Sequence, residues 1–279
     1  FVFLLVGVSS GYSWGASCTP AKDASSIAVA GGSITELLYL LGEEERIIAA
    51  DRTSNYPKEA AELPSVGYVR NISAEGILSL KPTLVLGEHD MGPDEVIKQI
   101  ENVSVEVIRV NEVHTAGGIV DKLRCVASIL GVNDKADALI ENQIGNLINQ
   151  LDIVRSRSEF RARVALVLNF SDGAPIIAGK NTSGGGVIEM AGAKNVFESV
   201  DGWKPVSRET LVGASPDYIV ITERALRAIG GLSGMEQDVA LRLTPAVQSG
   251  RVHAVDGMAL LGFGIRTLDA ALKLSSIFD

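Results

Sequence analysis

The chain has 279 residues, of which 46% are hydrophobic and 21% are charged. This composition supports a sizeable core in one large or two smaller domains and excludes intrinsic disorder. The formal net charge of -9, with no cluster of Lys and Arg, excludes a nucleic-acid-binding surface.

The first residues have the pattern of an export signal. The apolar run FVFLLVGV is followed by small and polar residues, as in the hydrophobic and cleavage regions of a secretory signal peptide. We therefore predict that residues 1–24 are a signal-peptide remnant or N-terminal tail. A buried first strand is the alternative, and the run is shorter than the roughly 20 residues of a membrane-spanning helix.

The chain has two cysteines, Cys18 and Cys125. Removal of Cys18 with the signal would exclude a disulfide, whereas its retention leaves lipidation open, although Gly15 stands where a lipoprotein site has Leu. Cys125 lies in the helical pattern IVDKLRCVASIL and is expected to pack as a small hydrophobe. Without a CxxC or Cys/His cluster, we predict no zinc or iron–sulfur site.

Strand-length apolar runs alternate with helix-period segments along the rest of the chain. This order predicts repeated β-α units in two α/β, Rossmann-like lobes, at residues 25–132 and 161–279. Between them, residues 133–160 have a helical period and no proline. A helix of about 25 residues would be roughly 37 Å long and would join the lobes rigidly.

An internal repeat supports two similar lobes. The segments SAEGILSLKPTLVL (73–86) and SRETLVGASPDYIV (207–220) share the spacing of Ser, Glu and Pro, and a strand-like run ends both. In each copy we expect a serine to cap a short helix, and the helix to end before Pro82 or Pro216.

The repeat places Glu75 and Glu209 at matching helix starts. Each carboxylate could simply complement its helix dipole. Their pairing across two lobes indicates instead two acidic knobs that contact a basic partner.

The segment VGYVR, residues 66–70, holds a tyrosine and an arginine two positions apart. In extended backbone, Tyr68 and Arg70 would point to the same side. An arginine stabilises a neighbouring phenolate, and tyrosine is one of the residues that hold haem iron. An exposed loop tyrosine beside a solvated arginine is the alternative.

Other polar segments are weaker candidates. His89 follows a strand at the end where open α/β sheets bind ligands, so it could approach a ligand. The alternative is a solvated loop histidine. His114 and His253 are expected to be ordinary strand-end residues. Trp203 either closes over a flat ligand or packs beside Pro205. GKNTSGGG, residues 179–186, lacks the P-loop order and is predicted to be a flexible loop.

Several long segments resemble one family. They are VAGGSITELLYLLG, DRTSNYPKEAAELPSVGYVRNISAEGILSLKPTLVL, APIIAGKNTSGGGVIEMAGAKNV, YIVITERALRAIGG and AVDGMALLGFGIRTLDAALKL. Together they resemble the periplasmic haem-binding proteins of bacterial haem ABC importers, over about residues 25 to 278. The resemblance implies the class III periplasmic binding protein fold and a monomer that carries haem b but catalyses no reaction.

The resemblance also implies roles for individual residues. Tyr68 would be the axial ligand of haem iron, and Arg70 its hydrogen-bond partner. Glu75 and Glu209 would dock on the inner-membrane permease dimer, after an outer-membrane receptor system has supplied the haem. Arg224 would meet a haem propionate, although Arg227 lies one helical turn away.

One departure from the family limits the ligand set. Some members have a histidine after the strand that corresponds to VALVLNF, but here Ser171 and Asp172 follow it. We therefore expect one haem with five-coordinate iron. Because a helix would join the lobes, we also expect little lobe closure on binding. The alternatives are a cobalamin or ferric-chelate carrier of the same fold and, from another class, a hydrolase or nucleotide-binding enzyme.

Overall fold

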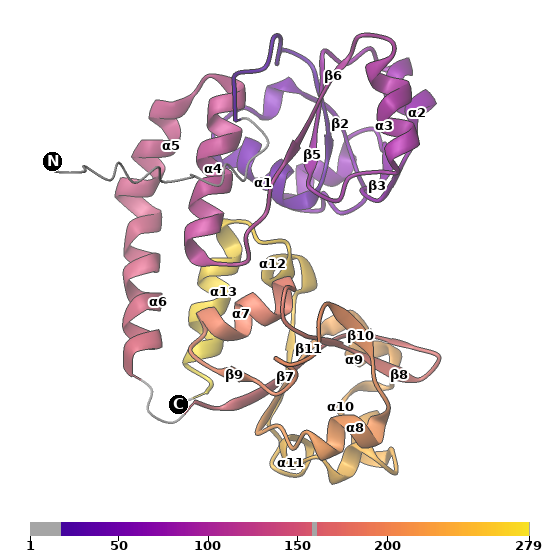
Figure 1. The fold of residues 1–279 in the computed structure, drawn as a ribbon, viewed down its shortest axis with the longest axis vertical. Helices are drawn as coiled ribbons and strands as arrows, with labels where there is room; N and C mark the ends of the chain where they lie inside the picture. Colours follow the sequence, from indigo (N-terminus) through magenta and orange to yellow (C-terminus); the bar gives the residue numbers. More distant parts are fainter. Residues whose placement is uncertain (1–17, 158–160, 279) are drawn as a thin grey trace, which may run out of the picture.

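The computed structural model describes residues 18–157 and 161–278, which form two α/β lobes joined along one side by helices (Figure 1). The predicted fold class is confirmed. The apolar run expected to be a signal peptide lies outside the described residues.

The N-terminal lobe is built on a parallel sheet of strand order β2-β1-β5-β6. Its strands are β2 (Ile47–Ala50), β1 (Ile27–Ala30), β5 (Leu84–Glu88) and β6 (Glu106–Val110). The central strands β1 and β5 are almost entirely apolar because helices cover both faces of such a sheet. The short elements are α1 (Gly32–Leu40), α2 (Ala74–Ser79), α3 (Asp94–Glu101), the 3-10 turns Glu44–Arg46 and Lys58–Glu62, and the hairpin β3 (Gly67–Tyr68) and β4 (Asn71–Ile72).

The C-terminal lobe has a mixed sheet of order β10-β8-β7-β11-β12, with β9 beside β7. Strands β7, β9, β11 and β12 pair in parallel, whereas β8, near one edge, pairs antiparallel with both of its neighbours, β7 and β10. The strands are β7 (Arg163–Ser171), β8 (Ala174–Ala178), β9 (Lys194–Asn195), β10 (Trp203–Pro205), β11 (Tyr218–Thr222) and β12 (Val252–Val255). The helices are α7 (Ser183–Met190), α8 (Arg208–Gly213), α9 (Glu223–Ala228), α10 (Gly231–Gln237), the 3-10 turn Leu241–Leu243, α11 (Pro245–Gln248) and α12 (Gly257–Leu261).

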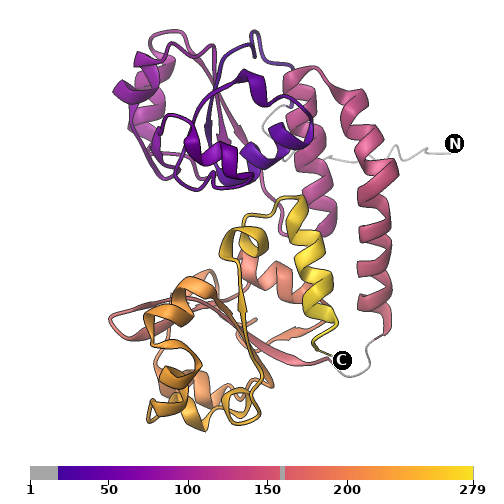
Figure 2. The ribbon, with the colours of Figure 1, turned by 180° about the vertical axis from the view of Figure 1, so that it is seen from behind.

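Long helices connect the lobes (Figures 1 and 2). They are α4 (Ala116–Leu130), α5 (Asn133–Leu139), the π-helical turn Ile140–Ile144, α6 (Gly145–Arg157) and α13 (Ile265–Ser275). From Asn133 to Arg157 the chain is continuously helical, and α13 packs against α6. Among the described helices, none is both long and apolar enough to cross a membrane.

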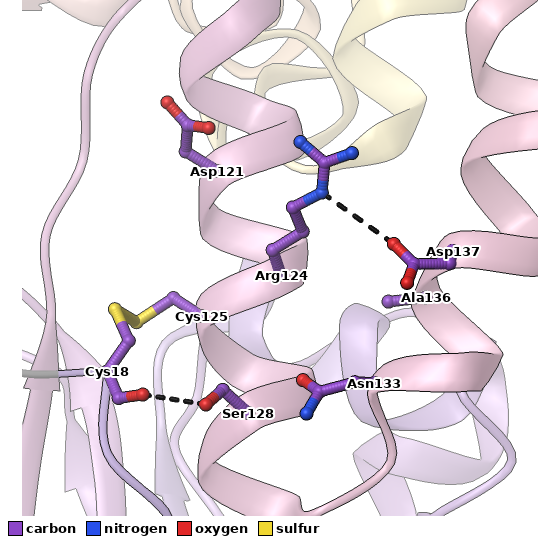
Figure 3. Close-up of a pocket in the computed structure, with 8 residues that line it drawn as sticks. All are labelled: Cys18, Asp121, Arg124, Cys125, Ser128, Asn133, Ala136 and Asp137. Carbon is purple, nitrogen blue, oxygen red and sulfur yellow. Dashed lines mark hydrogen bonds and ion pairs between the residues drawn. A yellow bond between two sulfur atoms is a disulfide. The ribbon is translucent and has the colours of Figure 1, made fainter.

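A disulfide corrects the prediction for the cysteines. Cys125 is buried, as expected, but it is bonded to Cys18 rather than packed as a free hydrophobe. The bond holds the start of the described chain against α4, where the Ser128 hydroxyl donates a hydrogen bond to the Cys18 carbonyl (Figure 3). The sequence did not show this pairing, because 107 positions separate the two cysteines.

The repeat between the lobes is confirmed in the structure. Ser73 caps α2 by accepting a hydrogen bond from the Gly76 amide, and Ser207 caps α8 in the same way with Thr210. Both helices end before the prolines, and the buried strands β5 and β11 follow. The two lobes therefore share one local framework.

The segment GKNTSGGG is not a loop throughout, so that prediction was wrong. Thr182 caps α7, which begins at Ser183 and includes the three glycines. These glycines allow close packing: a Cβ on Gly186 would lie 2.4 Å from the His114 carbonyl oxygen. Helix α7 thus packs closely against the segment that leads into α4.

Candidate functional site

Polar side chains gather at the carboxyl ends of the N-terminal sheet. Each of the four strands is followed within a few residues by such side chains, which include Ser33, Asp51, Glu88, Asp90, Glu112 and His114. Helix α12, which follows β12 in the other lobe, reaches this edge, since a Cβ on Gly32 would lie 2.7 Å from the Met258 methyl carbon. The carboxyl ends of the parallel strands in the two sheets therefore face each other, and ligands of open α/β folds usually bind at this end of the strands.

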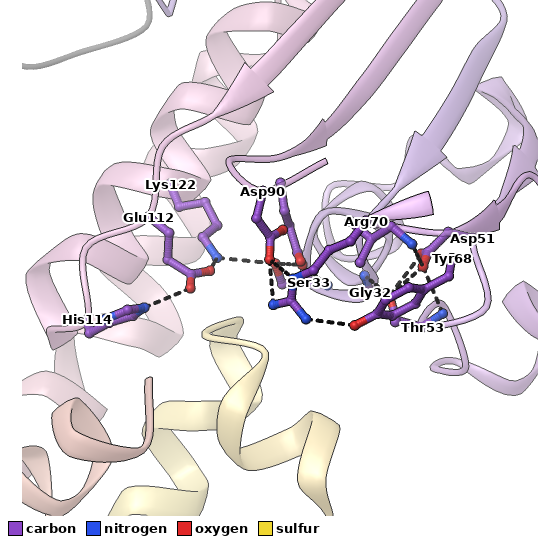
Figure 4. A network of polar contacts seen from close by, with 12 residues as sticks. Gly32, Ser33, Asp51, Thr53, Tyr68, Arg70, Asp90, Glu112, His114 and Lys122 are labelled. Atoms are coloured by element: carbon purple, nitrogen blue, oxygen red, sulfur yellow. Dashed lines mark hydrogen bonds and ion pairs between the residues drawn. The ribbon is translucent and has the colours of Figure 1, made fainter. Parts of the chain in front are cut away.

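Tyr68 and Arg70 lie on the β3–β4 hairpin at this edge (Figure 4). The Arg70 guanidinium donates to the Tyr68 hydroxyl oxygen at 2.7 Å and to the Asp90 carboxylate at 2.6 Å. Val69, between them, is buried in the core of the lobe. Val69 and Arg70 form the turn of the hairpin, so this turn, and not the extended chain that we expected, brings the arginine beside the tyrosine.

A second polar group runs from the start of α1 to α4 (Figure 4). Glu88 accepts hydrogen bonds from the amide and the hydroxyl of Ser33 at 3.1 and 2.7 Å. The buried Lys122 ammonium donates to the Ser33 hydroxyl and to Glu112, which also contacts His114 at 3.0 Å. This network extends from the centre of the sheet to the segment that leads into α4.

Burial and charge change the proton affinities in this network. Burial raises the pKa of Glu88 to about 7, although Lys122 and the Ser33 hydrogen bonds act against it. For Glu112, burial acts to raise the pKa, but the His114 hydrogen bond and the Lys122 charge hold it below its ordinary value. One carboxyl is therefore poised to bind a proton near neutral pH, and the other is ionised.

The lobes touch through the C-terminal helices. Arg266 on α13 forms an ion pair with Glu36 on α1, and its guanidinium lies 4.0 Å from the centre of the Tyr56 ring. His114 packs edge-on against Phe263, with ring centres 4.9 Å apart. His114 is therefore part of the contact between the lobes, not the ordinary strand-end residue that we expected.

The remaining predicted ligand-binding residues do not join the tyrosine cluster. Arg224 is exposed in the first turn of α9, and Arg227 pairs with Glu223 at 3.4 Å. His89 is exposed after β5. Trp203 on β10 is partly buried and packs close to Gly184 of α7. His253, on β12, stacks on Tyr218, and burial lowers its pKa.

Glu75 and Glu209 are both exposed in the first turns of their helices. Hydrogen bonds from its own amide and from the Ser207 hydroxyl hold the pKa of Glu209 below its ordinary value. Both predictions for these residues, dipole complementation and docking, fit this placement.

Sequence reasoning missed most of the charged residues around the tyrosine. They are Asp51, Glu88, Asp90, Glu112 and Lys122. Asp51 and Glu88 had a usable signal, because each stands at the carboxyl end of a strand. Lys122 had none, since a lysine on a helix of mixed pattern is usually solvated.

The family follows from a match over most of the chain. A family model described as periplasmic binding protein matches residues 27–258. This chain belongs to that family. Members of the family serve transport as substrate-binding proteins, so a membrane permease is the expected partner and the periplasm the expected location.

The proteins that this chain resembles include a haem-binding protein and a vitamin B12-binding protein. The structure titled periplasmic heme-binding protein BhuT in complex with two hemes is 34% identical, with a TM-score of 0.84, covering 91% of this chain and 98% of that one. The vitamin B12-binding protein of Pectobacterium atrosepticum is 28% identical, with 67% of each chain covered. YvrC, an uncharacterized ABC transporter substrate-binding lipoprotein of Bacillus subtilis, is 25% identical, and the match covers 92% of this chain and 81% of YvrC.

Proposed function

We propose that this periplasmic binding protein carries haem and delivers it to an ABC permease. The observation that supports haem most directly is the Tyr68 hydroxyl, held by Arg70 at the carboxyl edge of the N-terminal sheet. The likeness to haem-binding proteins over most of the chain supports the same cargo.

The geometry suits a phenolate ligand for Fe(III). The hydrogen bond that Arg70 donates uses one lone pair of the phenolic oxygen and fixes its position. Asp90 holds the guanidinium from its other side. The oxygen keeps further lone pairs for a metal, so Tyr68 is our proposed axial ligand of one haem b, and Arg70 its partner.

Arg224 is the proposed partner of a haem propionate. Arg224 begins a helix at the carboxyl end of β11, the edge of the C-terminal sheet that faces the other lobe, and its charge suits a propionate. Trp203 and His89 stay predictions. The ion pair of Arg266 with Glu36 supports the expected small closure of the lobes on binding.

Optical titration with haemin tests the cargo. We expect the wild type to bind one haem with a phenolate charge-transfer band, and Tyr68→Phe, which keeps the ring, to lose that band. Tyr39→Phe, a change on the partly buried tyrosine of α1, is the control. Equal spectra for wild type and Tyr68→Phe would overturn the proposed ligand.

Cobalamin is the second candidate, because a B12-binding protein is among the relatives. In that case Tyr68 would contact the corrin without binding its metal. Competition between haemin and cyanocobalamin, followed by calorimetry, separates the two cargoes. Tight cobalamin binding with no haemin binding would replace the haem proposal.

The proposed partners are an inner-membrane permease dimer and, upstream, an outer-membrane haem receptor system, with the carrier acting as a monomer. Glu75 and Glu209 are exposed on equivalent helices, which suits docking on basic residues. Changing both to Ala should leave haem affinity unchanged and reduce uptake in vesicles that contain the permease. Unchanged uptake would leave the two carboxylates with a role at their helix starts alone.

A further inference from the structure

Asp51 joins three chain segments below the tyrosine hairpin. It directly follows β2, and the residue is only 3% exposed. Its carboxylate accepts hydrogen bonds from the backbone amides of Gly31, Thr53 and Val69, at 2.9, 3.0 and 3.1 Å. The hydroxyls of Thr53 and Ser54 donate to it as well.

Every one of these partners is a donor. The three backbone amides can only donate, and the two carboxylate oxygens have enough lone pairs to accept all of these bonds. A buried carboxylate would be costly without such bonds, so the donors around it must keep their positions for the lobe to be stable. Asp51 therefore fixes the relative placement of the β1–α1 turn, the end of β2 and the hairpin.

The bond to the hairpin is made at Val69, between Tyr68 and Arg70. The Val69 amide donates to Asp51, and the Val69 carbonyl accepts from the Gly92 amide at 2.9 Å. The Val69 side chain is buried in the core of the N-terminal lobe. With both backbone groups and the side chain held, the two neighbouring residues have little freedom to shift.

We propose that Asp51 is a positioning residue for the iron-binding tyrosine. It acts through the Val69 amide and sets where the Tyr68 oxygen lies relative to the start of α1. The inference rests on the proposed haem function, because it assigns Asp51 a role in binding through Tyr68. It differs from the role of Arg70, which touches the phenol itself.

Asp51→Asn is the decisive variant. The asparagine amide has nearly the same shape but replaces one oxygen with an NH2 group. In either orientation of the amide, this NH2 group faces a backbone N–H, of Gly31 on one side or of Thr53 and Val69 on the other. We expect haem affinity to fall by about tenfold or more and the phenolate charge-transfer band to shift or weaken. An intensity change in the iron–phenolate Raman band reports ligand geometry, which a loss of stability alone would not alter.

Ser54→Ala is the matched control. Ser54 is equally buried and donates to the same carboxylate at 3.0 Å, but its removal leaves the bond to Val69 in place. We expect this variant to lose stability while it keeps the wild-type band and affinity. A band shift as large in Ser54→Ala as in Asp51→Asn would overturn the role of the Val69 bond.

Two further outcomes keep the inference separate from the haem proposal. If Tyr68→Phe loses the band and Asp51→Asn keeps it, the inference is wrong and the haem proposal stands. If Tyr68→Phe keeps the band, the haem proposal itself fails.

Amide exchange in the wild type without haem gives an answer even if Asp51→Asn does not fold. The Val69 amide should exchange as slowly as the amides of β1. Exchange at the rate of an exposed loop would overturn the inference.

Discussion

The two lobes have the same local framework but very different edges where they face each other. Glu88 and Thr222 occupy equivalent places, at the ends of the strands that follow the repeated helices. Glu88 accepts bonds from Ser33 and lies in a charged network. Thr222 instead caps α9 and donates to the Leu168 carbonyl at 2.8 Å.

This difference separates what holds a lobe together from what gives it a ligand site. Caps, helix ends and buried strands recur in both lobes because any β-α unit needs them. The largely buried ionisable groups Glu112 and Lys122 lie in the N-terminal lobe, whereas Glu223, Arg224 and Asp256, which follow strands of the C-terminal lobe, are exposed. A duplicated framework can therefore carry different polar groups on its two lobes.

The largest difference in stability should come from the disulfide, which only the N-terminal lobe has among the described residues. Cys18→Ser with Cys125→Ser should lower the free energy of unfolding by about 4 kcal/mol, because the bond restricts a long loop of the unfolded chain. Urea unfolding with and without reductant measures this. The double variant, which cannot respond to reductant, is the control. Equal urea midpoints for the wild type and the double variant without reductant would contradict the expectation.

The second test concerns the pH dependence at Glu88. Its pKa of about 7 in the folded protein exceeds the ordinary 4.5, so the folded state binds the proton more tightly. Glu88 contributes its full stabilisation below the pKa that it has in the unfolded chain, and this stabilisation is lost as the pH rises through about 7. Between about pH 5 and 8, unfolding free energy should fall by up to about 3 kcal/mol in the wild type and not in Glu88→Gln.

Thr222→Val is the matched change in the other lobe. It removes a hydroxyl that does not titrate, so the variant should keep the wild-type pH slope even if its stability is lower. Urea unfolding at a series of pH values gives the slope for each protein. A Glu88→Gln slope equal to that of the wild type would show that the carboxyl is not poised near neutral pH.

The smallest effect should be the same in both lobes. Ser73→Ala and Ser207→Ala each remove one helix cap and should each cost about 1 kcal/mol of unfolding free energy. Ser73→Thr and Ser207→Thr, which keep the hydroxyl, are the controls. Markedly unequal losses of unfolding free energy would mean that the two equivalent caps do not stabilise their lobes equally.

Much of the fold could be predicted from the sequence, because its signals are local. Apolar runs marked the buried strands, Ser73 and Ser207 marked the helix starts, and Pro82 and Pro216 marked their ends. The pairing of Tyr68 with Arg70 was also local, since only one residue separates them, although a hairpin turn and not an extended chain brings them together. The amino-acid sequence by itself therefore determined the two-lobed fold class and the central pair of the candidate site.

The surroundings of that pair were decided only by the tertiary structure. Asp51, Asp90 and Lys122 come from separate elements, and no local pattern shows that they meet. The Cys18–Cys125 bond and the contact of Arg266 with Glu36 join residues still farther apart in the chain. Such contacts depend on how whole elements pack, because burial selects the charge partners and decides which carboxyl, such as Glu88, keeps a proton.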